Sequence, residues 1–222
     1  MAVAFDAVSS QQNAAATSQT ISHTCTGANL VLYVITGGWD QTGRSITVTY
    51  AGTAMTEIAV SDASTGNDKT WLFRLVAPAT GANNIVVTIT GGVMHIRTGG
   101  ISLTGAHQTT FSTPQTGITE TAILISDTFA SAVGDMIVYG ATVGNDDTHT
   151  PLTGSNLTER YDLNGSGNGE GAAGGTAPGA ASLSVGIEWL TSGTAAGAGV
   201  NVKAAAADVA FVNRPFRPMP MI

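Results

Sequence analysis

The sequence predicts an all-β protein: an antiparallel β-sandwich of jelly-roll-like architecture with an extended C-terminal tail. Three observations predict this class. Residues 45–50, "SITVTY", alternate apolar and polar side chains without interruption, as a half-buried strand does. Similar segments recur about every 8 to 15 residues, separated by Gly, Pro, Asn or Asp. Convincing helical periodicity is absent from the sequence.

The expected strands are rich in β-branched and aromatic residues, and turn signals lie between them. They cover residues 3–9, 17–25, 29–36, 45–50, 54–61, 69–76, 83–90, 94–105, 121–128, 135–143, 157–163, 181–190 and 200–212. Gly52 predicts a hairpin after the fourth of them. Residues 202–211 have the alanine content of a helix, but the strand-like residues on both sides favour a strand pair or a bulge.

The length of 222 residues suits one large β domain, which we expect to cover residues 1–213. Charged residues make up only 10% of the chain, against about 25% in a typical globular protein. The outward positions of the expected strands carry Thr and Ser instead of Lys and Glu. Two interpretations remain open: an all-β protein packed through small residues, or a surface that contacts other proteins without charge repulsion.

The formal net charge is −7, from 8 Lys and Arg against 15 Asp and Glu, and there is no basic run. Nucleic-acid binding needs several basic side chains on phosphates, so we expect no nucleic-acid partner. We also expect no membrane partner, because no stretch approaches the ~20 apolar residues of a span. The start "MAVAFDAVSS" lacks the basic and apolar regions of a secretory signal. Cys25 is the only cysteine, which fits synthesis in a reducing cytoplasm.

Residues 163–181, "LNGSGNGEGAAGGTAPGAA", differ in composition from the rest of the chain. They are rich in Gly, Ala and Ser and carry one charge, Glu170. This composition predicts a flexible loop between two strands, or a loop that orders only against a neighbouring subunit. A phosphate-binding loop is excluded, because no Gly-Lys-Ser/Thr follows the glycines.

Residues 214–222, "RPFRPMPMI", form the second unusual segment. Three prolines forbid a helix and favour an extended path. An apolar, extended terminus packs either on its own domain or on a neighbour. In the second case the arm binds a partner protein. The side chains we expect to make that contact are Arg214, Phe216, Arg217, Met219, Met221 and Ile222.

No catalytic, cofactor or metal site is predicted from local motifs. None of the four histidines has the HExxH spacing, and "GISLTG" places Thr104 where a nucleophile elbow needs Gly. We therefore expect a protein that is not an enzyme and needs no cofactor.

Loose groups of carboxylates occur in two segments, Asp62 with Asp68 and Asp146 with Asp147. A glycosidase needs two carboxyl groups facing one cleft, which the sequence does not reveal. Such Asp-rich loops are also compatible with Ca²⁺, although turn formation is the simpler explanation.

Trp39 lies between glycines in "TGGWDQTG" and is a candidate for glycan binding. An exposed Trp can stack on a sugar ring, with Asp40 and Gln41 supplying hydrogen bonds. Alternatively Trp39 folds back over the end of the sandwich or lies in a subunit contact. Trp71 and Trp189 lie within strand patterns and are expected in the core.

The order of the N-terminal motifs resembles a β-sandwich family common in tailed-phage virion proteins and related bacterial surface proteins. The motifs are "SHTCTGANLVLYVIT", "ITVTYAGTAMTEIA", "WLFRLVAPATGANNIVVTIT" and "GGISLTGAHQTT". The resemblance covers residues 1–145 well and the remainder loosely. In "TGAHQTT", His107 departs from the more usual acidic residue of the family.

The resemblance implies a virion structural component, either a capsid decoration protein or a tail-associated module. It implies no catalytic residue, because the shared motifs are strands and turns. The expected partners are the major capsid protein or other virion proteins and further copies of the chain, with a trimer favoured. The expected location is the virion surface, after assembly in the host cytoplasm. The alternative function is a carbohydrate-binding module on a phage tail or fibre that recognises a host glycan.

Overall fold

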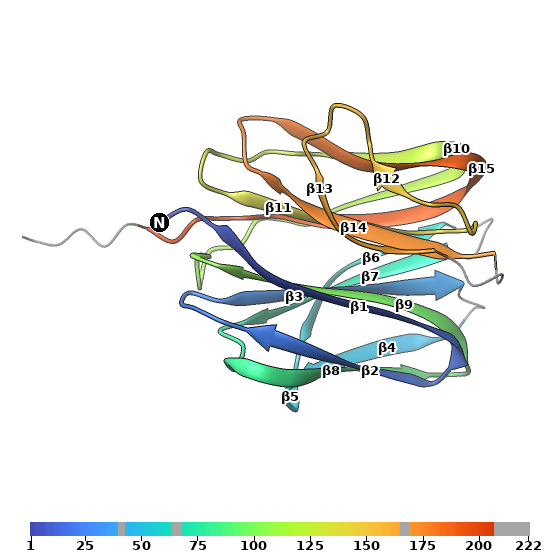
Figure 1. Ribbon diagram of the computed structural model, residues 1–222, viewed down its shortest axis with the longest axis horizontal. Coiled ribbons are helices and arrows are strands. Elements are labelled where there is room, and N and C mark those ends of the chain that lie inside the picture. Colours follow the sequence, from blue (N-terminus) through green and yellow to red (C-terminus); the bar gives the residue numbers. More distant parts are fainter. Residues whose placement is uncertain (40–42, 64–67, 165–168, 207–222) are drawn as a thin grey trace, which may run out of the picture.

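The computed structural model describes residues 1–39, 43–63, 68–164 and 169–206, and it confirms the all-β class (Figure 1). All paired strands run antiparallel, and no helix occurs in these ranges. Three sheets are stacked face to face, so the sandwich has a third layer. The jelly-roll-like arrangement is not confirmed by the observed strand orders.

The four-stranded outer sheet has the order β2-β8-β4-β5, and the central five-stranded sheet has the order β1-β9-β3-β7-β6. Their strands are β1 (Ala4–Ala16), β2 (Ser18–Cys25), β3 (Val31–Trp39), β4 (Ser45–Tyr50), β5 (Thr53–Ala54), β6 (Thr56–Ala63), β7 (Asp68–Val76), β8 (Gly81–Thr90) and β9 (Met94–Thr104).

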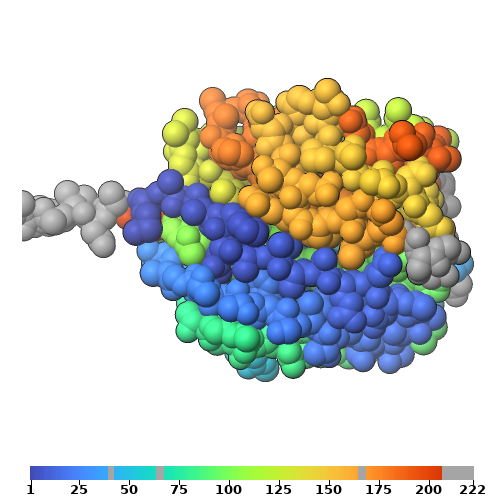
Figure 2. Space-filling view, in the orientation of Figure 1, coloured from blue at the N-terminus to red at the C-terminus, as the bar shows by residue number. Residues whose placement is uncertain are grey.

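The six-stranded sheet has the order β10-β15-β11-β14-β13, and β12 also pairs with β15. Its strands are β10 (Gln115–Phe129), β11 (Met136–Val143), β12 (Thr150–Pro151), β13 (Thr158–Leu163), β14 (Gly171–Pro178) and β15 (Leu183–Val202). The N-terminal part of the chain thus forms two layers and the C-terminal part forms the third. Figure 2 shows these parts in contact, with β1 in dark blue beside the orange surface of β13 and β14.

The central sheet is covered on both faces. In β3, every residue from Val31 to Gly38 is buried, as expected of a strand with sheets on both sides. Alternate side chains contribute to two different cores. Leu32 and Val34 face the four-stranded sheet, whereas Tyr33 and Ile35 face the six-stranded sheet. The uninterrupted apolar residues at 30–35 therefore have a structural cause: both faces of this strand are buried.

The four-stranded sheet shows the opposite pattern, because one of its faces is open. In β2, burial alternates at each residue from Ser18 to Cys25, and β4 has the same bounds as the segment predicted from "SITVTY". The inward residues Ile46, Val48 and Tyr50 join the core against the central sheet. Period-two alternation thus predicts both the strand and its buried face.

The longest strand, β15, bends so that the six-stranded sheet covers part of itself. One half of β15, from Ala195 to Val202, pairs with β11 and in part with β10. The other half, from Leu183 to Glu188, pairs with β10 and at its last two residues also with β12. Irregular pairing near Ala122 marks the bend in β10. A third core lies inside this turn and contains Phe129 and Trp189. Trp189 and Trp71 are therefore core residues, as predicted.

The prediction of a flexible loop at residues 163–181 is wrong for residues 171–178, while residues 165–168 lie outside the described residues. Within this range β14 runs from Gly171 to Pro178, pairs with β11 and β13, and is buried from Gly171 to Ala177. Its small residues leave room for Tyr161 of β13. A Cβ atom added at Gly174 would lie 2.6 Å from the Tyr161 hydroxyl oxygen. The low side-chain volume of this segment therefore reflects close packing.

The C-terminal predictions fall partly outside the described residues. β15 ends at Val202, and Ala204 makes an isolated bridge with Ala106. The predicted strand pair or bulge in residues 202–211 and the domain end at 213 extend beyond residue 206. The predicted arm, residues 214–222, lies wholly outside the described residues.

We predict that Gly99→Ala lowers the free energy of unfolding by about 1–3 kcal/mol, the usual cost of overpacking a core. A Cβ atom at Gly99 would lie 2.1 Å from Cε1 of Tyr161, in a ring that also contacts Gly140 and Gly174. Urea denaturation of the variant and the wild type measures this difference.

The control for this prediction is Gly193→Ala, whose added Cβ would meet only Asn145 Nδ2 at 3.1 Å and backbone beyond it. It should change stability by less than about 0.5 kcal/mol. In the double variant Gly99→Ala/Tyr161→Ala the two costs should be less than additive. Equal stability of Gly99→Ala and the wild type would contradict the packing argument.

Candidate functional site

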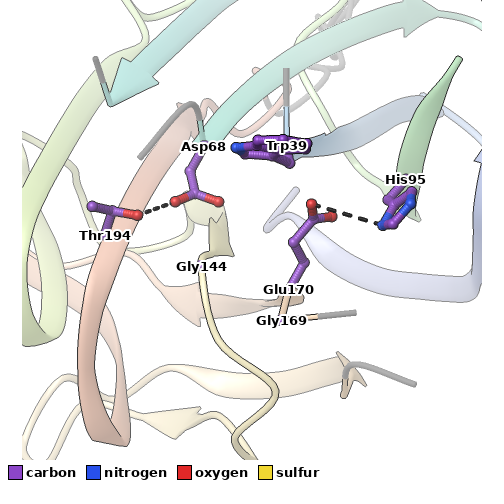
Figure 3. Close-up of a pocket in the computed structure, with 7 residues that line it drawn as sticks. All are labelled: Trp39, Asp68, His95, Gly144, Gly169, Glu170 and Thr194. Carbon is purple, nitrogen blue, oxygen red and sulfur yellow. Dashed lines mark hydrogen bonds and ion pairs between the residues drawn. The ribbon is translucent and has the colours of Figure 1, made fainter. Parts of the chain in front are cut away.

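A hollow of about 430 Å³ lies at one end of the molecule, where the central and six-stranded sheets meet (Figure 3). This volume is in the range of small-molecule binding sites. The lining residues come from both sheets and from the segments beside their strands. They are Trp39, Asp68, His95, Gly144, Gly169, Glu170 and Thr194.

Strand pairing places Trp39 and Asp68 together. Trp39 ends β3, Asp68 begins β7, and the two are direct partners in the register. Direct partners in antiparallel strands project from the same face of the sheet. At Gly38, β3 passes close to β9. Only glycine permits this approach, because a Cβ atom at this position would lie 1.9 Å from the carbonyl oxygen of His95. Trp39 and His95 thereby become neighbours at the rim.

The Trp39 side chain is available to a ligand, since the residue is 40% exposed. It belongs to none of the buried core clusters. Trp39 and His95 also line a second hollow of about 230 Å³, which contains Arg44. Arg44 Nη1 donates to the Trp39 carbonyl oxygen at 3.5 Å.

Asp68 presents a buried carboxyl group to the hollow. The residue is 1% exposed, and Thr194 Oγ1 donates a hydrogen bond to Oδ2. Oδ1 is buried and has no hydrogen-bond partner. Burial raises the pKa of Asp68 to about 7, and the nearby Glu120 charge adds to this effect, whereas the Thr194 bond opposes it.

Gly144 makes the contact between Asp68 and Thr194 possible. A Cβ atom at Gly144 would lie 2.6 Å from Asp68 Oδ2 and 2.8 Å from Thr194 Oγ1. A larger residue at this position would therefore separate β7 from β15.

Glu170 presents the second buried carboxyl group. The residue is 4% exposed, and Oε1 lies 3.9 Å from His95 Nδ1. Oε2 is buried and has no hydrogen-bond partner. Burial raises the pKa of Glu170 to about 7, and the Asp68 and Asp146 charges also raise it. Arg97 and the Trp39 backbone N–H favour the charged form and limit the rise.

The backbone around Glu170 is held by charged side chains below the hollow. Asp146 accepts hydrogen bonds from the N–H groups of Gly169 and Glu170, each at 3.0 Å. Arg97 Nη2 donates to the Glu170 carbonyl oxygen at 3.1 Å. The Glu170 side chain is thereby directed into the hollow, as Figure 3 shows.

The arrangement joins an exposed aromatic ring to two desolvated carboxyl groups, each with an oxygen that has no partner. Asp68 and Glu170 point into the same space beneath Trp39 (Figure 3). Such oxygens can accept hydrogen bonds from a ligand that enters the hollow. Among the described residues, no group of three or more His, Cys, Asp or Glu has an arrangement that could hold a metal ion.

The predicted site residues have different outcomes. Trp39 lines the hollow, whereas Asp40 and Gln41 lie outside the described residues. The six predicted partner-binding residues of the arm, listed above, also lie outside them. Of the paired carboxylates, Asp68 reaches the hollow, while Asp62 forms an ion pair with Lys69 at 3.2 Å.

The sequence alone did not reveal Glu170, His95 and Thr194 as site residues. Glu170 is the single charge of a segment predicted to be a flexible loop, and that feature could have drawn attention to it. His95 and Thr194 have no local motif. Their proximity depends on contacts between two sheets.

Two other buried histidines each have a polar partner within the protein. Ser9 Oγ lies 2.8 Å from Nδ1 of the buried His23. His149 Nδ1 lies 2.9 Å from Asp162 Oδ1, and its ring packs edge-on against Trp189. Cys25 is buried and unpaired. The part of the chain described by the structure includes no helix long and apolar enough to cross a membrane.

Comparison with family models, with curated proteins and with solved structures finds no significant match to this chain.

We predict that Asp68→Asn and Glu170→Gln each stabilise the protein at pH 8. In the unfolded chain these groups have pKa values near 3.8 and 4.5, and in the folded chain near 7. The folded chain therefore holds the protons more tightly. Protonation of these two carboxyl groups therefore stabilises the folded chain. This contribution to the free energy of unfolding is complete below about pH 4 and is lost as the pH rises through 7.

Thermal unfolding from pH 5 to 8.5 tests this prediction. Each variant should lose less stability than the wild type over this range, and its Tm at pH 8 should rise by roughly 2–4 °C for each kcal/mol recovered. Asp62→Asn is the control, because that carboxylate is 57% exposed and ion-paired. A pH dependence identical to that of the wild type in both site variants would contradict the assignment.

Proposed function

We propose that the chain is a non-enzymatic structural protein of a virus particle, a capsid decoration or cement protein bound to the particle surface in many symmetric copies. The sequence resemblance to tailed-phage virion proteins supports this function. The structural observation that supports it best is the uncharged outer face of the four-stranded sheet.

In β2, β4 and β8, all of whose residues the structure describes, this outer face consists of small polar residues with a few apolar ones and includes no charged residue. Its members are Ser18, Thr20, Ser22, Thr24, Ser45, Thr47, Thr49, Ala82, Asn84, Val86, Thr88 and Thr90. Strand pairing aligns them in rows, as in Ser18–Thr88–Thr47. Ser45 and Thr90 are joined by a hydrogen bond of 2.6 Å between their hydroxyl groups.

An uncharged hydroxyl-rich face suits contact between protein surfaces. Burying an unpaired charge in an interface costs several kcal/mol, whereas hydroxyl groups find partners among neighbouring polar atoms and bridging waters. With a net charge of −7, the chain keeps its charges away from this face. Many copies can then pack on a capsid without mutual repulsion there.

The proposed partners are the major capsid protein or other virion proteins, and the proposed assembly is a homotrimer at the virion surface, formed in the host cytoplasm. The C-terminal arm, residues 214–222, is a second proposed contact. We propose this contact in addition to docking through the outer face of the four-stranded sheet.

We predict that Thr88→Lys and Thr88→Glu each weaken binding to particles roughly tenfold or more, because either charge would be desolvated on docking. Purified protein is added to particles that lack the chain, and bound copies per capsid subunit are counted by quantitative mass spectrometry. The wild type should reach a simple ratio to the capsid subunit.

Leu190→Lys is the control for added charge, because Leu190 is 85% exposed and lies on β15, in the opposite outer layer. It should bind as the wild type does. The proposal is contradicted if both Thr88 variants also reach the wild-type ratio, or if the wild type does not bind particles.

The hollow beneath Trp39 favours a second candidate function, glycan binding on a phage tail or fibre. An exposed indole ring beside buried hydrogen-bond acceptors is the combination that a sugar requires. The ring covers the apolar face of a pyranose, and the acceptors bind its hydroxyl groups. Trp39, Asp68 and Glu170 supply these elements.

We predict that Trp39→Ala reduces glycan affinity tenfold or more, by roughly 1.4 kcal/mol, while the free energy of unfolding falls by about 1 kcal/mol or less. The ring lies at the rim, outside the core clusters. Trp39→Phe should retain part of the affinity. Saturable binding on a broad glycan array that does not depend on Trp39, or no binding at all, would remove this candidate.

A further inference from the structure

We propose that the hollow beneath Trp39 binds a sugar with a free amine, whose ammonium group is held between the Asp68 and Glu170 carboxylates. This inference rests on the second candidate function, glycan binding, and names its ligand class. The observation behind it is the pair of carboxylate oxygens, Asp68 Oδ1 and Glu170 Oε2, that are buried and without a hydrogen-bond partner.

These oxygens are costly to leave unsatisfied. Asp68 is 1% exposed, and the Glu170 side chain is 6% exposed, so water compensates little of their charge. A buried polar group without a partner calls for an explanation such as an absent ligand. Both oxygens belong to side chains that line one hollow and point into it (Figure 3).

The charged groups around the hollow are predominantly acidic. Asp68 is affected by Glu120 of β10, whose Oε2 also lacks a partner. Glu170 is affected by Asp68 and by Asp146, which follows β11. The hollow therefore repels anionic sugars, such as uronic acids.

Three cations lie nearby, and one of them, Arg97, favours the charged form of Glu170 and offsets part of this acidic character. Arg97 donates to the Glu170 carbonyl oxygen from a buried position. Arg44 lines the second hollow, on the other side of Trp39. Lys69 forms an ion pair with Asp62. His95, at 3.9 Å from Glu170 Oε1, contributes positive charge only when protonated.

An ammonium group meets these requirements better than a hydroxyl group does. It carries a positive charge and three donors, so it can donate to more than one carboxylate oxygen and neutralise the repulsion between Asp68 and Glu170. An indole ring also attracts a cation that lies against its face. The exposed part of Trp39 then contacts the sugar ring, which distinguishes an amino sugar from a simple amine.

The pKa values add a signature that a neutral sugar would not give. Burial raises the pKa of both Asp68 and Glu170 to about 7, so both are partly protonated near neutral pH. An ammonium group favours the ionised carboxylates, and its binding therefore releases protons. Among the described residues, the other titratable groups that act on the pair are Glu120, Asp146, Arg97 and His95.

The test uses methyl glycosides of glucosamine and galactosamine, their N-acetyl derivatives, and the parent glucose and galactose compounds. Within each series the ligands differ only at carbon 2. Affinities at pH 7 and proton release are both measured by calorimetry, in two buffers of different ionisation enthalpy, so the readout is the same for the wild type and for Trp39→Ala. Propylamine serves as an amine without a sugar.

We expect at least one amino sugar to bind tenfold or more tightly than its N-acetyl and hydroxyl counterparts, with release of protons. In Asp68→Asn/Glu170→Gln this preference should vanish, and in Trp39→Ala all binding should weaken. Asp62→Asn removes one exposed charge outside the hollow and should keep the preference, which separates the site from general attraction to an acidic protein.

The outcomes distinguish this inference from the glycan function on which it rests. Equal binding of amino, N-acetyl and hydroxyl sugars overturns the inference and leaves glycan binding intact. Equal binding of propylamine and the amino sugars overturns the sugar part. A preference that survives in Asp68→Asn/Glu170→Gln overturns the assigned carboxylates. No binding of any sugar, here and on the glycan array, overturns both.

Discussion

The close approach of the central sheet to the six-stranded sheet is the constraint on which the rest of the structure depends. The Tyr161 side chain occupies the space that a Cβ atom would need at Gly99, Gly140 and Gly174. One aromatic ring thus contacts three strands, β9, β11 and β14, from both sheets. Because interiors are packed at crystal-like density, this ring fixes the spacing of the two layers and the positions of all groups between them.

The same interface explains where the hollow lies. Thr70 Oγ1 donates to the Ala196 carbonyl oxygen at 2.8 Å and also lies 2.8 Å from the hydroxyl oxygen of Thr142, across the two sheets. Two residues further along come Asp68 of β7, Thr194 of β15 and Gly144, which directly follows β11. The hollow therefore continues a polar seam beyond the point where the layers pack tightly. Its carboxyl groups are buried because they belong to strand ends that the packing draws together.

The sequence predicted the parts of this fold that depend on local alternation. Residues 45–50 have one open face, so their period of two was visible and the prediction of their facing side chains was correct. Residues 17–25 were predicted as a strand, and β2 covers all of them but Thr17. The sequence did not predict β14, because its glycines serve a contact with Tyr161 that no local pattern encodes. Flexible and tightly packed segments can share a small-residue composition, and only the partner distinguishes them.

For the site too, the sequence revealed a residue with a conspicuous local context, and it did not reveal which distant residues the fold brings together. Trp39 was identified because a Trp between glycines is conspicuous in a sequence, and it does line the hollow. Asp68 and Glu170 are about a hundred positions apart and meet only because strand ends of two stacked sheets lie together. Docking through the outer face of the four-stranded sheet would leave this hollow open, because the hollow lies on the far side of the central sheet from that face. The two proposed functions use separate surfaces that differ in charge: the docking face is uncharged, and the hollow is acidic. Attachment to a particle and capture of a cationic sugar are therefore physically compatible in one chain.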